Sequence, residues 1–194
     1  MKKYAKLEDG ALRLMGRVPN IVNPTDAQVA AYAAAHGFKE LVAVEQPGRY
    51  YRKGYAETDA AITETWTPWE LDAAKADALR EVQGRRDAAM NGVVIPCAGL
   101  PNGILYNTEA VTNALGLTLL EAKGALPAGQ TWTDAADETH ELTSTLLASI
   151  SLAMVTHGNG VQERFRPARD AVRAAEDVDA VEAALELAEQ LAAN

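Results

Sequence analysis

The chain has a single cysteine, few aromatic residues and less positive than negative charge. Cys97 stands alone among 194 residues, which excludes an internal disulfide and fits a reducing cytoplasm or a particle assembled there. Aromatic residues make up only 6%, and alanine is abundant, which favours helices packed through small side chains over a sheet sandwich. Lys and Arg total 18 against 27 Asp and Glu, a formal charge of -9. Such an acidic chain is a poor general nucleic-acid binder, because phosphate contacts need clustered cations.

Long apolar runs and common catalytic signatures are also missing. No stretch approaches the roughly 18 apolar residues of a membrane span, so we expect no membrane contact. There is no Walker loop, no G-x-G-x-x-G and no G-x-S-x-G, which removes the usual signatures of phosphate binding and serine hydrolysis. Hydrophobic residues nevertheless make up 48%, enough for a real core.

The first third of the chain mixes strand signals with one helix. Asp9-Gly10 stands between two short alternating segments and predicts a hairpin. Thr25 and Gln28 form a capping-box pattern at the start of a helix, and Gly37 is suited to end it. Further strands are expected at 41–44, 50–57 and 61–66.

Beyond Pro68 the composition shifts to alanine and charge, which marks a domain boundary. Helical spacing predicts a helix over 70–91, and two short apolar runs around 99–103 predict a hairpin. The later helices are expected from Asn107 or Thr108 to about 123, from a Thr143 cap to a break at 157–160, around Phe165 with Pro167 starting or kinking the helix, and after Asp177 or Asp179. The predicted fold class is therefore α+β: a small α+β module with hairpins at 1–67, then a mostly α-helical domain with one short hairpin at 70–194.

The polar residues most suggestive of chemistry lie at 130–143, QTWTDAADETHELT. Asp134, Asp137 and His140 are spaced three apart and Glu141 follows, so a metal site, an acid/base pair and a turn are the alternatives. A zinc motif of the HExxH type needs a second histidine four residues after His140, and position 144 is serine.

A turn leading into the next helix explains this stretch best. Asp and Thr side chains hydrogen-bond local backbone ahead of helices, and Thr143 is placed as the cap. Trp132, the only large aromatic residue for some distance, is expected to fill the core beside it. We therefore predict no catalytic residue, no bound metal and no cofactor.

The remaining histidines and the cysteine have structural interpretations. His36 and His157 each precede a glycine, which suggests contact with the last carbonyls of a helix. Cys97 lies between apolar residues without a neighbouring base, so we expect a small buried side chain.

Three groups of residues are candidate partner contacts. Arg49 and Tyr51 belong to a basic-aromatic cluster at 49–53, a composition seen in single-strand binders, but strand alternation splits it across two faces. A charged hairpin face or a contact with an acidic partner fits it better. Trp66 and Trp69 either wedge two modules together or mark a partner site.

Arginines form the third group. Arg166, Arg169 and Arg173 follow one side of a helix, beside its apolar stripe. They make either a solvated flank or an ion-pair seam with a neighbouring helix or subunit.

Several stretches resemble known phage sequences. Residues 72–190 are similar to a helical domain of unknown function found in tail and tail-fibre-associated proteins of tailed bacteriophages. The matching stretches are REVQGRRDAAMNG, GILYNTEAV, WTDAADETHELT and ARDAVRAAEDVDAVEAAL. The N-terminal part, with MKKYAKLEDG, NPTDAQ and YYRKGYAETDAAITETWTP, resembles the leading module of such proteins, including tail fibre assembly proteins.

This resemblance implies a non-enzymatic protein that docks on, or helps to assemble, the tail fibre or receptor-binding apparatus. Its partner would be a tail fibre or baseplate protein, met in the host cytoplasm during assembly. A permanent, oligomeric tail subunit of the virion, involved in host attachment, is the alternative. A metal-dependent hydrolase using Asp134, Asp137 and His140 is the remote third.

Overall fold

The computed structural model describes residues 2–193, which divide into two compact units, Met1–Leu71 and Asp72–Asn194. Helices account for 48% and strands for 24%, with the larger sheet first and most helices after it, so the predicted α+β class is confirmed.

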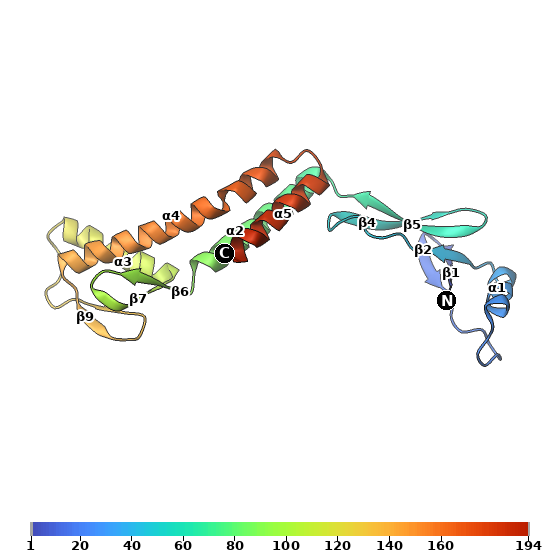
Figure 1. Cartoon of the computed structure of the whole chain (residues 1–194), viewed down its shortest axis with the longest axis horizontal. Helices are drawn as coiled ribbons and strands as arrows, with labels where there is room; N and C mark the ends of the chain where they lie inside the picture. The colour runs from blue at the N-terminus through green and yellow to red at the C-terminus, as the bar shows by residue number, and fades with distance from the viewer. Residues whose placement is uncertain (1, 194) are drawn as a thin grey trace. The chain divides into compact units, whose positions relative to one another are not determined.

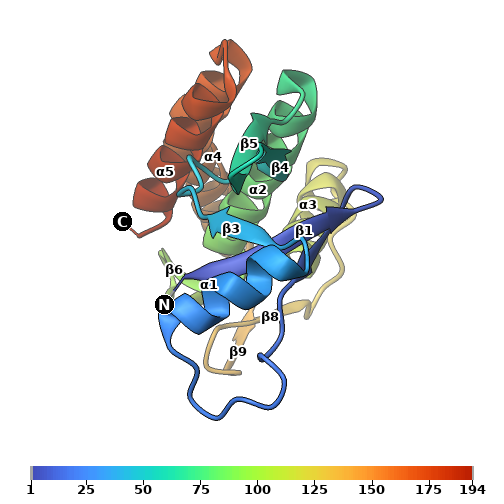
Figure 2. The ribbon, with the colours of Figure 1, turned by 90° about the vertical axis from the view of Figure 1, so that its right-hand side faces the viewer.

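The first unit is built on a mixed sheet. Within the described residues its five strands follow the order β2-β1-β3-β5-β4, and every neighbouring pair is antiparallel except β3 and β5. Figure 2 shows this sheet together with α1, which buries Val29 and Ala33. The elements are β1 (Lys3–Glu8), β2 (Ala11–Leu14), α1 (Asp26–Ala35), β3 (Lys39–Val42), β4 (Tyr51–Glu57) and β5 (Ala61–Pro68).

Local signals placed most of these elements, although β3 is Lys39–Val42 and not 41–44. Asp9 and Gly10 take φ angles of 50° and 79° in the β1–β2 turn, which confirms the predicted hairpin. The predicted capping box of α1 is formed, since the Thr25 N–H donates to Gln28 Oε1 at 2.9 Å and the Gln28 N–H donates to Thr25 Oγ1 at 3.3 Å. His36 is the C-cap, with its Nδ1 2.9 Å from the Tyr32 carbonyl oxygen, as expected of a helix-end histidine.

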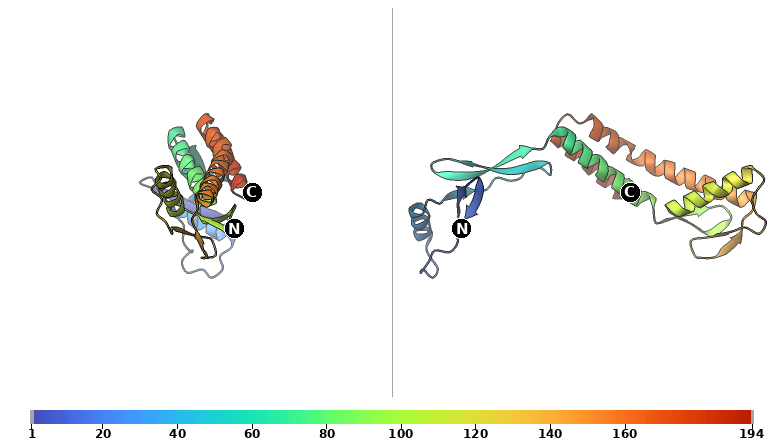
Figure 3. Two further views of the ribbon diagram at one scale, coloured as in Figure 1. Left: turned by 90° about the vertical axis from the view of Figure 1, so that its left-hand side faces the viewer. Right: turned by 180° about the vertical axis from the view of Figure 1, so that it is seen from behind.

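The second unit contains a helical bundle with an alanine-rich core. α2 (Leu71–Met90), α4 (Ser144–Ala174) and α5 (Val178–Ala193) run beside one another (Figures 1 and 3). Arg85 of α2 makes ion pairs with Glu81 at 2.7 Å and with Glu189 of α5 at 2.6 Å. The buried side chains are mostly small, which lets the helices approach closely: Ala74, Ala78, Val82, Val161, Phe165, Ala168, Val172, Val181, Ala184, Leu185 and Ala188.

A second core lies under the first half of α4. It is enclosed by β6 (Val93–Cys97), β7 (Leu100–Tyr106), α3 (Thr108–Ala122), β8 (Thr131–Thr133) and β9 (Thr139–Glu141). Trp132 is 5% exposed in this core, as predicted. The predicted caps Asn107, Thr143 and Asp177 all accept hydrogen bonds from the first turns of their helices.

The sequence-based prediction of a helix break at 157–160 is wrong. α4 continues through His157, Gly158 and Gly160. His157 lies inside this helix and its Nε2 is 3.1 Å from the carbonyl oxygen of Met90, the last residue of α2. A Cβ at Gly158 would lie 3.0 Å from Tyr106 Oη, so this glycine admits a neighbouring side chain and does not end the helix.

Pro167, predicted to start or kink a helix, does not start a new one. It lies within α4, which runs to Ala174. A proline inside a helix costs about 3 kcal/mol. Burial of Phe165, Ala168 and Val172 on either side of it offsets that cost through packing.

The helical domain also has more β structure than expected. The predicted hairpin is present as β6–β7, although its turn lies at Ala98-Gly99 and not over 99–103. The stretch predicted as a turn is a second hairpin, β8–β9, in which Thr131–Thr133 pairs with Thr139–Glu141. None of the helices in residues 2–193 is long and apolar enough to cross a bilayer.

Candidate functional site

The loop between β8 and β9 is organised around the carboxylate of Asp134. This residue is 5% exposed and is the one buried charged residue in the described part of the chain. Its Oδ1 accepts hydrogen bonds from the backbone N–H groups of Ala136 at 2.9 Å and Glu138 at 3.0 Å. Its Oδ2 accepts from Asn102 Nδ2 and His140 Nε2, each at 2.9 Å. Four donors occupy the roughly four lone-pair positions of a carboxylate.

These bonds determine the ionisation of Asp134. Burial alone raises the pKa of this carboxyl, but the hydrogen bonds from His140, Asn102 and the two backbone N–H groups outweigh it. The pKa of Asp134 therefore lies well below its ordinary value of 3.8. The carboxylate is held ionised because the folded loop supplies its donors.

Asn102 joins β7 to this loop. Its Nδ2 donates to Asp134 and also to Glu138 Oε2 at 3.2 Å. The sequence analysis missed Asn102, since it lies 32 residues before Asp134 in what was expected to be an ordinary turn. Asp134, Glu138 and His140 each bring one ligand-type atom within 4.8 Å of the others, the closest approach to a metal cluster among residues 2–193.

The predicted polar set is only partly brought together. Asp134 and His140 are in contact, whereas Asp137 and Glu141 are not part of the cluster, and Glu138 takes their place. Asp137 instead adopts a left-handed φ of 61° in the turn. The N–H groups that donate to the Asp134 oxygens tie the two ends of the loop to β7 and β9.

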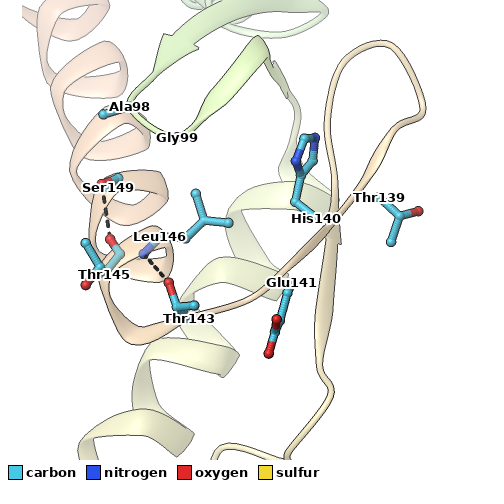
Figure 4. Close-up of a pocket in the computed structure, with 9 residues that line it drawn as sticks. All are labelled: Ala98, Gly99, Thr139, His140, Glu141, Thr143, Thr145, Leu146 and Ser149. Atoms are coloured by element: carbon cyan, nitrogen blue, oxygen red, sulfur yellow. Dashed lines mark hydrogen bonds between the residues drawn. The ribbon is translucent and has the colours of Figure 1, made fainter.

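A hollow beside His140 is also lined by residues with structural contacts. It is bounded by the Ala98-Gly99 turn, β9 and the start of α4 (Figure 4). Thr143 Oγ1 accepts from the Leu146 N–H at 3.1 Å, and Ser149 Oγ donates to the Thr145 carbonyl at 3.1 Å. The hydroxyls of Thr143 and Ser149 are therefore engaged in hydrogen bonds at the start of α4.

Cys97, near the end of β6, is half-buried, so the prediction of full burial is too strong. Burial raises the pKa of the Cys97 thiol, which keeps the less reactive protonated form.

The candidate contacts of the first unit form two clusters on opposite faces of β4. Lys53 lies 5.5 Å from the ring centre of Trp66, whose Nε1 donates to the Val44 carbonyl at 3.0 Å. On the other face, Arg52 lies 5.8 Å from the ring centre of Trp69. The predicted division of the basic-aromatic stretch across two faces agrees with the strand register.

We call the second of these the docking cluster: Arg49 and Trp69 against the buried ring of Tyr50, with Arg52 over Trp69. Trp69 meets the Tyr50 ring edge-on at 5.5 Å, and the Arg49 guanidinium lies 5.6 Å from the same ring centre. Tyr51, also predicted as a contact, is half-buried at the start of β4.

The three arginines of α4 pair within their own helix. Arg166 contacts Glu163, while Arg169 and Arg173 approach Asp170 at 3.1 and 3.9 Å. Arg85 and Glu189, which were not singled out from the sequence, form an ion pair that joins α2 and α5.

The sequence analysis also missed an exposed apolar surface on α3 and α4. Large aliphatic side chains are exposed there to 60% at Leu115, 55% at Leu119, 68% at Leu152 and 59% at Val155. These four residues are called the apolar strip below. These four positions lie outside the buried stripe of each helix, so a search for buried positions does not find them.

Comparison with known proteins gives one match. A family profile described as a domain of unknown function, DUF4376, matches residues 73–187. The matched range includes the Asp134 loop and the apolar strip. No curated protein and no solved structure matches the chain.

Proposed function

This chain belongs to the DUF4376 family of domains of unknown function, and from that premise we propose that it is a non-enzymatic bacteriophage tail protein. In this proposal it docks on the tail fibre or receptor-binding apparatus, or assists its assembly, in the cytoplasm of the host. A fibre or baseplate protein is the partner.

The Asp134 network supports a non-enzymatic role. Asp134, the residue that most suggested chemistry in the sequence, uses its carboxylate lone pairs to accept hydrogen bonds from N–H donors of the loop and of Asn102. A general base or a metal ligand needs lone pairs directed at a substrate or an ion.

The observation that carries the proposal is the docking cluster. Trp and Arg are the residue types that most often dominate binding energy at protein interfaces. Here they surround a buried tyrosine ring, which fixes Trp69 before any partner arrives. Positive charge on an otherwise acidic chain favours an acidic partner surface.

The sequence resemblance supplies the phage setting. It covers residues 72–190, nearly the same range as the family match, and it extends into the first unit through the YYRKGYAETDAAITETWTP stretch, which contains Arg52. The two lines of support therefore overlap at Tyr50 and Arg52.

Co-expression with the neighbouring fibre gene, followed by size-exclusion chromatography, tests the proposal. The two proteins should elute together, and Arg52→Ala should weaken the complex by about 30-fold, the effect of a hot-spot arginine. Arg13→Ala is the matched control, because Arg13 is an exposed arginine of β2 outside the docking cluster. Separate elution, or equal loss in both variants, would contradict the proposal.

A permanent virion subunit is the second candidate, and the apolar strip favours it, because a subunit of a symmetric assembly needs a face for its neighbouring copies. Proteomics of purified virions separates the two. An assembly factor should be scarce or absent in the particle, whereas a subunit should be present in fixed copy number.

The hydrolase alternative has its own test. We expect calorimetric titration of zinc or manganese into the purified protein to show no tight binding, because the Asp134 oxygens are occupied. A tight isotherm that disappears in His140→Ala would establish a metal site instead.

A further inference from the structure

The apolar strip crosses the seam between α3 and α4. The hydroxyls of Thr118 and Ser151 are 2.9 Å apart and join the two helices at this seam. Ser144 also contacts Glu121, so the residue numbers run in opposite directions along the two helices. Figure 3 shows α3 lying along the first half of α4.

The four strip residues share one solvent-facing surface. Leu115 is one turn before Thr118, and Val155 is one turn after Ser151, so both lie beside the seam at the same level. Leu119 and Leu152 follow next to them on the outer side of each helix. Leu117 and Met154, only two residues from Leu115 and Leu152, are buried, so the strip is separate from the core.

The segments that carry the strip have no charged residues. Neither 110–120 nor 142–162 contains Asp, Glu, Lys or Arg, although these residues make up 23% of the chain. Serine, threonine and asparagine surround the strip instead. An apolar centre with an uncharged polar rim is the composition of a protein interface core and its border.

The absence of charge suits a contact with a second copy of this chain. In a contact across a two-fold axis the groups near the axis meet their own copies, so a charged group there would face a like charge. Two copies with a net charge of -9 each repel one another over most of their surfaces, but not here. Hydroxyl groups both donate and accept hydrogen bonds, so a rim of Ser and Thr is compatible with itself.

A different protein is a poorer match for this surface. Partners of different sequence are usually selected by opposite charges, which steer the encounter and reject competitors. The strip provides no such charge, whereas the docking cluster does. We propose that the chain forms a two-fold symmetric homodimer through Leu115, Leu119, Leu152 and Val155. This inference goes beyond the proposed function and does not depend on it.

Sedimentation velocity of the full chain, over about 5–500 μM, tests the dimer. The wild-type protein should shift from monomer toward dimer as the concentration rises. Leu152→Glu places one charge on each side of the two-fold contact, and a cost of about 3 kcal/mol for a like-charge juxtaposition corresponds to a roughly 100-fold weaker dimer.

The matched control is Gln83→Glu, which adds the same charge at an exposed position of α2 outside the strip. It should leave the dimer constant within about twofold. Circular dichroism should show both variants folded, because Leu152 and Gln83 are exposed. Val155→Glu is the second strip variant and should repeat the effect of Leu152→Glu.

Three outcomes would overturn the inference. One is a monomer throughout the concentration range. Another is a dimer that tolerates both strip variants as well as it tolerates Gln83→Glu. The third is a monomer whose complex with the co-expressed fibre protein is lost in Leu152→Glu, which would assign the strip to that partner.

Discussion

The carboxylate of Asp134 couples the folding of the β8–β9 loop to pH. Its pKa is low in the folded chain and close to 3.9 in the unfolded chain. A group with a depressed folded pKa contributes stability above the unfolded value, and this stability is lost as the pH falls from there toward the folded value. The decrease in the free energy of unfolding at acid pH is therefore due in part to this one residue.

Replacing Asp134 with Asn should remove that contribution. The amide nitrogen of Asn cannot accept hydrogen bonds from His140 and Asn102, so the variant should be clearly less stable than wild type at pH 7. The gap between the two urea midpoints should narrow as the pH is lowered from 4 to 2.5. Asp137→Asn is the control for the loss of one charge in the same loop, because asparagine also tolerates the left-handed φ at this position. A gap that stays constant with pH would contradict this account.

Trp132 permits a direct test of core packing. Its side chain is buried between β7, α3 and α4, so Trp132→Ala should lower the free energy of unfolding by about 3–5 kcal/mol. Thr131→Ala, at the exposed neighbour, should change it by no more than about 0.5 kcal/mol. Urea unfolding followed by circular dichroism measures both. Equal small effects would mean that the ring does not support the core.

Single residues were predictable where their role is local. The Thr25, Asn107, Thr143 and Asp177 caps and the Asp9-Gly10 turn follow from a few neighbouring residues, and all are confirmed. Asn102 was not predictable, because its contact with Asp134 joins positions 32 residues apart. The sequence signal at 134–141 indicated a turn but could not show which side chains close it.

In α4, the longest helix, tertiary packing overrides the local sequence preferences. Glycine inside a helix costs about 1 kcal/mol relative to alanine, which made 158–160 look like an end. At Gly158 the missing Cβ leaves room for the Tyr106 hydroxyl, and the neighbouring His157 ring lies 4.6 Å from the Tyr106 ring centre. These contacts come from β7 and cannot be read from the helix alone.

The two glycines make a matched pair for measurement. Gly160 has open space where a Cβ would stand, so Gly160→Ala should stabilise the protein by about 0.5–1 kcal/mol. Gly158→Ala gains the same helix propensity but places its methyl 3.0 Å from Tyr106 Oη, and that gain should be lost. Urea unfolding of the two variants should rank Gly160→Ala above Gly158→Ala. The reverse order would show that the Tyr106 contact does not constrain the helix.

At the scale of the whole molecule, the chain divides between Leu71 and Asp72. The core under the first half of α4, which we call the hairpin core, and the alanine-rich core of the bundle both lie after this boundary. Only Leu71, the first residue of α2, lies before it. Composition alone indicated a boundary near Pro68, because the sequence becomes rich in alanine and charged residues after it.

A fragment of residues 72–194 should therefore fold without the first unit. Its urea unfolding should be cooperative, and Trp132, the one tryptophan it contains, reports on the hairpin core through its fluorescence. The transition midpoint should not depend on whether residues 1–71 are present. A fragment with no cooperative transition would show that the second unit needs the first.

α4 takes part in both cores of the second unit without interruption. Ile150 and Met154 are buried in one core, and Phe165 and Val172 are buried in the other, on a single rod about 46 Å long at 1.5 Å per residue. Because one helix packs into both cores, opening of either core exposes part of the same helix. Amide hydrogens from its two halves should consequently exchange with deuterium through one shared opening event, and the bundle and the hairpins should behave as a single foldon.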